Sequence, residues 1–156
     1  MFPSEDEITM GEVIQLINEL TNGEAVMVTD VGQHQMWVAQ AYPFTRPRQW
    51  ISSGGLGTMG FGLPTAIGMA LAQPDITTLC FSGDGSFMMN IQELATLAEE
   101  NLNVKVIILN NNHLGLVRQQ QTLFYKKNLS AVKFQQGVDF AMAAKSMGVN
   151  GMNLGQ

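Results

Sequence analysis

Two apolar runs joined by a helical segment constrain the fold of this chain more than any other feature. The run at 76–81 leads into Gly83-Asp84-Gly85, and the run at 104–109 leads into Asn110-Asn111. The residues from 87 to 100 have helical spacing, and their expected inward face is Met88, Ile91, Leu94, Ala95 and Ala98. A strand, a helix and a second strand predict a right-handed crossover between two parallel strands.

Parallel strands bring Asp84 and Asn111 to the same carboxyl edge of the sheet, where open α/β folds bind ligands. The glycines beside Asp84 leave room for a ligand to come close. A carboxylate and an amide oxygen suit a hard cation such as Mg²⁺, which usually takes few ligands from the protein and the rest from phosphate and water. The pattern therefore predicts a magnesium-diphosphate site.

The rest of the chain also alternates strands and helices, which predicts an α/β fold with a mostly parallel sheet and helices on both faces. Thr9 and Glu12 form a capping-box pattern before a helix that runs to about Leu20. The expected inward face of that helix is Val13, Leu16, Ile17 and Leu20. Further expected elements are strands at 25–29 and 50–51, helices at 33–41, 60–72, 113–125 and 138–147, a mobile loop at 126–136 and a frayed start at 1–7.

Composition narrows the class of protein. The chain has 156 residues, which predicts one domain, and only 13% of them are charged, which favours a surface partly covered by a partner. A net charge of −5 without a basic stripe argues against nucleic-acid binding. We find no secretory signal and no apolar run of membrane-spanning length, so we expect a cytoplasmic protein with no membrane contact. Cys80 lies in a predicted core strand and is expected to be inert.

A competing motif is present. Residues 55–60 read Gly-Leu-Gly-Thr-Met-Gly, which matches the dinucleotide fingerprint G-x-G-x-x-G, and Asp84 ends the next predicted strand. The segment before these glycines, 48–53, is short and half polar, unlike a buried first strand of a dinucleotide-binding fold. The glycines around Asp84 and the downstream asparagines also have no part in ribose binding. These features favour the magnesium-diphosphate site.

The segment from Gly83-Asp84-Gly85 to Asn110-Asn111 resembles the cofactor motif of thiamine diphosphate enzymes. The segments 31–37, 53–64 and 116–121 resemble the large catalytic subunit of acetolactate (acetohydroxyacid) synthase, and the resemblance runs from about Val26 to Gly148. It implies that residues 1–156 are the single C-terminal, diphosphate-binding domain of that family. The pyrimidine-binding and central domains have no counterpart here, so we expect a fragment of a longer chain.

The resemblance implies roles for individual residues. Backbone amides at helix starts would hold the diphosphate, and Mg²⁺ would bind Asp84, Asn111 and the main-chain carbonyl of His113. Gly57 and Met59 would bind the aminopyrimidine through backbone groups, with the Met59 side chain between the two rings. Gln120 stands where many relatives carry a tryptophan of the second-substrate pocket, which puts the usual acceptor preference in doubt. The expected cofactor-binding residues are Val31, Gly32, Gln33, His34, Gly57, Thr58, Met59, Gly83, Gly85, Ser86, Gly115 and Leu116.

The family reaction is decarboxylation of pyruvate and carboligation to a second 2-oxo acid in branched-chain amino acid biosynthesis. In relatives the activating glutamate belongs to the pyrimidine-binding domain of a neighbouring subunit, so we assign no catalytic residue here and expect the chain to be inactive alone. The resemblance also implies a homo-oligomer and a possible regulatory small subunit. FAD occurs in the full-length family enzyme and is not expected to bind this domain.

Two other interpretations stay open. In the first, the chain is a separate diphosphate-binding subunit of another thiamine diphosphate-dependent 2-oxo acid decarboxylase. In the second, it is a non-catalytic binding module. The sequences Gly-Gln-His-Gln-Met-Trp at 32–37 and Leu-Val-Arg-Gln-Gln-Gln at 116–121 disfavour the first. Intact Asp84, Asn111 and Gly57 argue against decay of the site, and so against the second.

Overall fold

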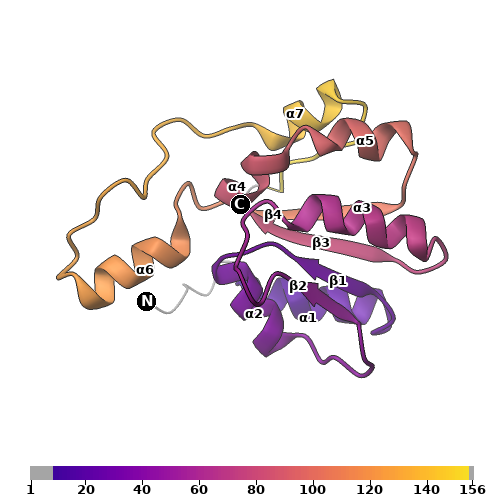
Figure 1. Ribbon diagram of the computed structural model, residues 1–156, viewed down its shortest axis with the longest axis horizontal. Helices are drawn as coiled ribbons and strands as arrows, with labels where there is room; N and C mark the ends of the chain where they lie inside the picture. Colours follow the sequence, from indigo (N-terminus) through magenta and orange to yellow (C-terminus); the bar gives the residue numbers. More distant parts are fainter. Residues whose placement is uncertain (1–8, 155–156) are drawn as a thin grey trace.

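The computed structural model describes residues 9–154, and its elements alternate as the sequence predicts (Figure 1). The expected frayed start at 1–7 lies outside the described residues. The elements in chain order are α1 (Met10–Leu20), β1 (Val26–Thr29), α2 (Gln33–Ala41), β2 (Trp50–Ser52), α3 (Gly62–Ala72), β3 (Thr78–Gly83), α4 (Asp84–Phe87), the 3-10 turn η1 (Met88–Asn90), α5 (Glu93–Glu99), β4 (Val104–Leu109), α6 (Gly115–Phe124) and α7 (Phe140–Ser146).

The four described strands form one parallel sheet in the order β2-β1-β3-β4. Val28 lies opposite Cys80 in the register of β1 and β3, and Cys80 lies opposite Val106 of β4. After β1 the chain forms β2 on one side of β1, and it then forms β3 on the other side of β1. The strand order therefore reverses between β1 and β3, which is the place where open α/β sheets form a ligand crevice at their carboxyl ends.

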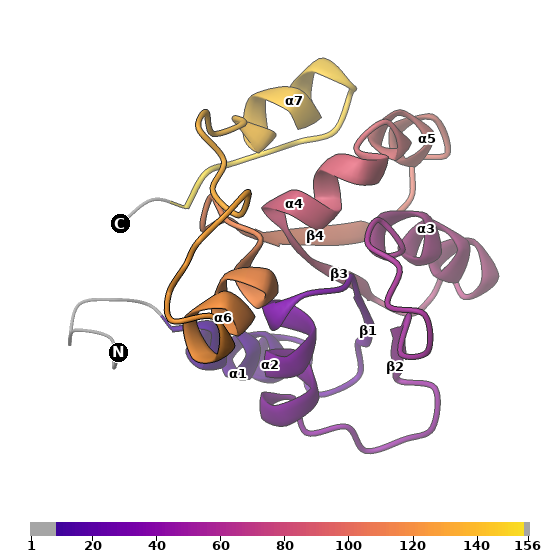
Figure 2. The same cartoon turned by 60° about the vertical axis from the view of Figure 1, so that its left-hand side comes forward.

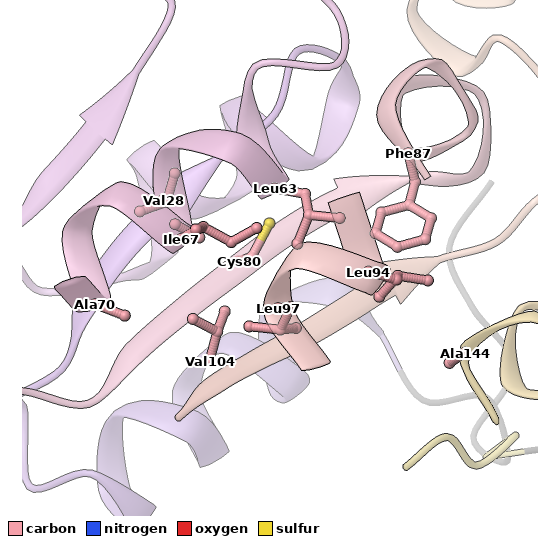
Figure 3. Packing of buried hydrophobic residues seen from close by; sticks show 11 residues of the cluster. Val28, Leu63, Ile67, Ala70, Cys80, Phe87, Leu94, Leu97, Val104 and Ala144 are labelled. Carbon is pink, nitrogen blue, oxygen red and sulfur yellow. The ribbon is translucent and has the colours of Figure 1, made fainter. Parts of the chain in front are cut away.

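Helices cover both faces of the sheet, which confirms the predicted fold class (Figure 2). Because side chains alternate along a strand, β1 and β3 contribute residues to two separate cores, one on each face of the sheet. Met27, Leu79 and Phe81 face α1 and α2, whereas Val28 and Cys80 face the side of α3 and α5. Figure 3 shows the second core, in which the Cys80 thiol lies among aliphatic side chains. Burial, and secondarily the nearby Asp30, raise the pKa of this thiol, in accord with an inert cysteine.

The inward face predicted for α1 was partly wrong. The capping box of Thr9 and Glu12 forms as predicted, but Leu16 and Leu20 are 54% and 73% exposed. The fully buried residue is Ile14, with Val13 and Ile17 packed partly beside it. The spacing of apolar residues alone does not reveal that α1 packs along α2. Ile14 shares a core with Val38 of α2 and with Met27 and Phe81 of the sheet.

The predicted helix from 87 to 100 is divided in two. It begins earlier, at Asp84, and it is interrupted after the 3-10 turn that ends at Asn90. The Asn90 side chain bonds the backbone of Gly60 and the side chain of Gln92 instead of pointing into solvent, and such local bonds compete with a regular helix. Leu94 is buried as predicted and Ile91 packs partly against the same core, whereas Met88 and Ala95 are exposed. Phe87 and Leu97 are buried although they were not predicted to face inward.

The last third of the chain is less compact. Helix α6 contains no buried residue, and Figure 1 shows it standing apart from the sheet. The segment at 126–136, predicted as a loop, is joined to the β4–α6 connection at one point, where Val132 accepts from the Leu114 amide and Phe134 donates to Asn112. None of the described helices is long and apolar enough to span a membrane.

Candidate functional site

A cavity of about 510 Å³ opens at the carboxyl ends of β1, β3 and β4. This is the edge that the sequence predicts, and it includes the point where the strand order reverses. Met10 and Val13 of α1 add an apolar wall. Most of the predicted site residues line this one cavity: Val31, Gly32, Gln33, His34, Met59, Gly83, Asp84, Gly85, Ser86, Asn111, His113, Gly115 and Leu116.

Asp84 is the carboxylate of the site. It is the first residue of α4, directly after β3, and its side chain is only 5% exposed. Oδ1 accepts a hydrogen bond from the Gly85 amide at 2.9 Å, whereas the buried Oδ2 has no partner among residues 9–154. An unpaired buried carboxylate oxygen is costly. A bound cation would satisfy it.

Asn111 and His113 form a tight turn after β4. The Asn111 side-chain oxygen accepts from the His113 amide at 2.9 Å, and His113 Nδ1 lies 2.7 Å from the Asn111 carbonyl. The short contact to a carbonyl requires the proton on Nδ1, so the imidazole is bound to its own turn. Across residues 9–154, no three Asp, Glu, His or Cys side chains gather around a possible metal position. The site therefore offers one carboxylate together with amide and main-chain oxygens.

His34 is the second residue of α2 and lines the cavity. The ring is buried, and its Nε2 has no hydrogen-bond partner in the described part of the chain. Desolvation lowers the pKa of His34, and the nearby Asp30 opposes that shift only in part. A side chain at Gly32 would place its Cβ 2.8 Å from His34 Cε1, and one at Gly83 would place it 3.1 Å from Nδ1. Both glycines therefore leave the space that a neutral imidazole fills.

Two further glycines, Gly85 and Gly115, allow the turns of the site to pack closely against each other. A Cβ at Gly85 would come within 2.7 Å of Leu114, and a Cβ at Gly115 would collide with the Gln33 side chain. Gln33 donates to Gln119 at 2.9 Å, so the start of α2 is bonded to α6. Ser86 Oγ donates to the Val31 carbonyl at 2.7 Å and joins α4 to the turn after β1. These contacts leave the amides of several helix starts around one cavity.

Three predicted residues do not line the cavity. Gly57 and Thr58 lie in an exposed turn in which both amides bond Ser53, at 3.1 Å to its carbonyl and 3.0 Å to its hydroxyl. Gly57 has φ +65°, a conformation that favours glycine. Gln120 is exposed on α6. Of the predicted pyrimidine-binding segment, only Met59 reaches the cavity.

Sequence reasoning missed Asp30. This residue follows β1 as Asp84 follows β3, and it is 1% exposed. Its carboxylate accepts from the amides of Val31 and Gly60, both at 2.8 Å, and from two further donors. The signal was present, because an acidic residue directly after an apolar strand and close to a glycine is the same pattern that identified Asp84.

Comparison with known proteins identifies the family of this arrangement. A family model described as the C-terminal TPP binding domain of thiamine pyrophosphate enzymes matches residues 30–155. The Acetolactate synthase isozyme 1 large subunit of Escherichia coli (strain K12) is 54% identical over 149 residues, which is 96% of this chain and 26% of that protein.

Plant relatives are similar over about three quarters of the chain. Acetolactate synthase 2, chloroplastic, of Zea mays is 59% identical over 79% of this chain and 19% of that protein. Acetolactate synthase, chloroplastic, of Arabidopsis thaliana is 60% identical over 74% of this chain and 17% of that protein. The chain thus spans about a quarter or less of the length of these curated relatives, and the resemblance stated from its motifs is confirmed.

Proposed function

This chain belongs to the C-terminal domain family of thiamine pyrophosphate (thiamine diphosphate) enzymes, and on that premise we propose that it binds Mg²⁺ and thiamine diphosphate as part of an acetolactate synthase. The observation that carries the proposal is the unpaired Oδ2 of Asp84. It is a buried anionic ligand, at the carboxyl edge of the sheet, inside a cavity whose other walls are helix starts and glycine turns. A cation with a diphosphate beside it completes such a site.

The remaining residues fit the same ligand. The Asn111 amide oxygen and the His113 carbonyl would be the other protein ligands of Mg²⁺. Amides of the turns at 31–34, 83–86 and 115–116 would hold the diphosphate, because each turn opens a helix or lies beside one. The uncharged His34 would offer its unpaired Nε2 to a phosphate oxygen. The turn at 57–59 would bind the aminopyrimidine through its backbone.

When bound, the cofactor supplies the carbanion chemistry by which a 2-oxo acid loses CO₂ and is joined to a second one. This chain would orient it, exclude water through the apolar walls and hold its metal. The activating carboxylate would come from the pyrimidine-binding domain of a neighbouring subunit. The proposal therefore includes a homo-oligomer in the cytoplasm that takes pyruvate and a second 2-oxo acid as substrates. It also includes a role in branched-chain amino acid biosynthesis. A regulatory small subunit would be a further partner, and FAD is not expected to bind here.

Calorimetry of the 156-residue chain tests the proposal. We expect thiamine diphosphate to bind when Mg²⁺ is present and to bind far more weakly when EDTA removes the metal. NAD serves as the comparison ligand, because the glycines at 55–60 also match a dinucleotide fingerprint. Tighter binding of NAD than of thiamine diphosphate with Mg²⁺ would refute the proposal.

A turnover assay tests the expected incompleteness of the site. We expect no acetolactate from pyruvate when the purified chain is saturated with thiamine diphosphate and Mg²⁺, because no glutamate among residues 9–154 lines the cavity. Loss of the activating carboxylate removes general acid-base help worth roughly 10²- to 10⁴-fold. Turnover by the chain alone, at a rate comparable to that of an intact acetolactate synthase, would show that the chain carries its own activating group.

A further inference from the structure

We propose that Asp30 and Asn90 are positioning residues that clamp Gly60 between them and so fix the position of the Gly57–Met59 backbone, of which Met59 reaches the cavity. The inference rests on the proposed function, in which that backbone binds the aminopyrimidine ring. Neither Asp30 nor Asn90 belongs to the cavity lining. Their effect on a ligand would be exerted through the loop that they hold.

The clamp uses both backbone polar groups of one residue, Gly60. The Gly60 amide donates to Asp30 Oδ1 at 2.8 Å, and the Gly60 carbonyl accepts from Asn90 Nδ2 at 2.7 Å. The Gly62 amide adds a bond of 3.2 Å to Asp30 Oδ2. A buried carboxylate that accepts backbone N–H groups makes stronger hydrogen bonds than neutral pairs do. Gly60, which follows Met59, is therefore bonded by two separate segments of the chain, the turn after β1 and the 3-10 turn η1.

Steric fit makes the clamp rigid. Gly60 has φ +86°, and a Cβ there would lie 2.9 Å from Asn90 Nδ2 and 3.0 Å from the Cβ of Met89. A Cβ at Gly62 would lie 3.0 Å from both Cβ and Oδ2 of Asp30. The loop backbone thus rests directly on the two clamping side chains. A side chain at Gly60 or Gly62 would therefore not fit without a shift of these neighbours.

The loop has little other support on its cavity side. Residues 54–58 are exposed, and Leu56 is 95% exposed. Within residues 9–154, the backbone hydrogen bonds at the other end of the loop are local: Gly54 donates to the Ser52 carbonyl, Gly57 to the Ser53 carbonyl and Thr58 to the Ser53 hydroxyl. Gly60, bonded through both its amide and its carbonyl, is therefore the held end of a loop whose residues 54–58 are exposed.

Asp30 differs from Asn90 in one respect that makes the inference testable. Its carboxylate also accepts from the Val31 amide at 2.8 Å and from Ser82 Oγ at 3.3 Å. Asp30 therefore joins the ring-binding loop to the turn after β1 and to the end of β3, where the diphosphate and the metal would bind. Among the described residues, the Asn90 side chain bonds only Gly60 of the ring-binding loop and its neighbour Gln92. Loss of Asn90 should affect one end of the ligand, and loss of Asp30 should affect both ends.

The experiment measures the dissociation constants of thiamine diphosphate and of inorganic diphosphate, both with Mg²⁺, by calorimetry on the 156-residue chain. We expect Asn90→Ala to weaken thiamine diphosphate roughly 3- to 10-fold, the worth of one hydrogen bond, and to leave inorganic diphosphate unchanged. We expect Asp30→Asn to weaken both ligands. Asp139→Asn is the matched control, because Asp139 also accepts a backbone amide, from Met142 at 2.9 Å, but lies outside the cavity lining.

The outcomes separate this inference from the proposed function. If Asn90→Ala weakens both ligands equally, or neither, the clamp does not act on the ring and the inference is wrong. If the wild-type chain binds inorganic diphosphate as tightly as thiamine diphosphate, the loop does not hold the ring, which also overturns the inference. If the wild-type chain binds neither ligand, the proposed function itself fails. Should Asp30→Asn not fold, the partly exposed Asn90 decides the question, with circular dichroism to show that the variant is folded.

Discussion

Asp30 and Asp84 follow the neighbouring strands β1 and β3 and differ in how fully their carboxylates are hydrogen-bonded. Asp30 ends its strand with a carboxylate that accepts from four donors. Asp84 ends the next strand with one oxygen bonded to Gly85 and the other unpaired. Because burying a carboxylate oxygen without a partner is unfavourable, the first aspartate serves the fold and the second is suited to a ligand.

Replacing Asp84 with alanine should remove metal-dependent cofactor binding and leave the fold nearly unchanged. The variant loses one bond to the Gly85 amide but also the cost of the unpaired oxygen, so we expect the free energy of unfolding to change by about 1 kcal/mol or less. We expect thiamine diphosphate affinity with Mg²⁺ to fall at least tenfold, roughly 1.4 kcal/mol. Calorimetry measures it, with the exposed Asp75→Ala as control; an unchanged dissociation constant would contradict the assignment.

His34 should make the stability of the chain depend on pH. Burial lowers the pKa of the folded-state imidazole below 6.5. As the pH falls through 6.5 toward the folded-state pKa, the unfolded chain binds a proton that the folded chain does not. The free energy of unfolding should therefore fall in this window, by at most about 1.4 kcal/mol per pH unit, and this group should have no effect above pH 7.5.

Urea unfolding of the wild-type chain at pH 7.5 and pH 5.5 measures this dependence. His34→Gln should reduce the difference between the two pH values, because glutamine does not titrate. His113→Gln is the comparison, since its imidazole is bound to an exposed turn. Equal pH dependence in His34→Gln and in the wild type would refute the assignment of the titration to His34.

At the scale of elements, regular hydrophobic patterns were predicted well and tertiary contacts were not. The strand at 104–109 forms as predicted, and the strand predicted at 76–81 forms at Thr78–Gly83, because a buried parallel strand is a continuous apolar run. The break after Asn90 was not predictable, because it depends on a bond to Gly60, which lies thirty residues earlier. The buried stripe of α1 depends likewise on its contact with α2.

Helix α6 and the segment after it should be the least protected part of the domain when no cofactor is bound. Leu123, Phe124 and Tyr125, the residues that would pack this segment down, are 65% to 74% exposed. Few buried contacts imply local opening at low free energy. Hydrogen exchange should be much faster across 119–136 than across β4, and slower when thiamine diphosphate and Mg²⁺ are added. Protection across 119–136 equal to that of β4 would show that the segment is held permanently.

At the scale of the whole molecule, the site is assembled from turns that are distant in sequence and adjacent only in the sheet. The order β2-β1-β3-β4 places the turns after β1, β3 and β4 side by side, with the reversal between β1 and β3. Sequence patterns predicted the edge but not this strand order, because periodicity shows where strands lie along the chain and not which of them pair. The contribution of α1, through Met10 and Val13, was missed for the same reason.

Chemical-shift mapping of the backbone amides tests most directly that this edge of the sheet binds the cofactor. Titration of the chain with thiamine diphosphate and Mg²⁺ should shift the amides at 31–34, 83–86 and 113–116, and then those at 57–60. Inorganic diphosphate with Mg²⁺ should shift the first three groups and leave 57–60 nearly unchanged. Shifts confined to other surfaces, such as the groove between β4 and α7, or no shifts at a saturating ligand concentration, would contradict a cofactor site at the carboxyl ends of β1, β3 and β4.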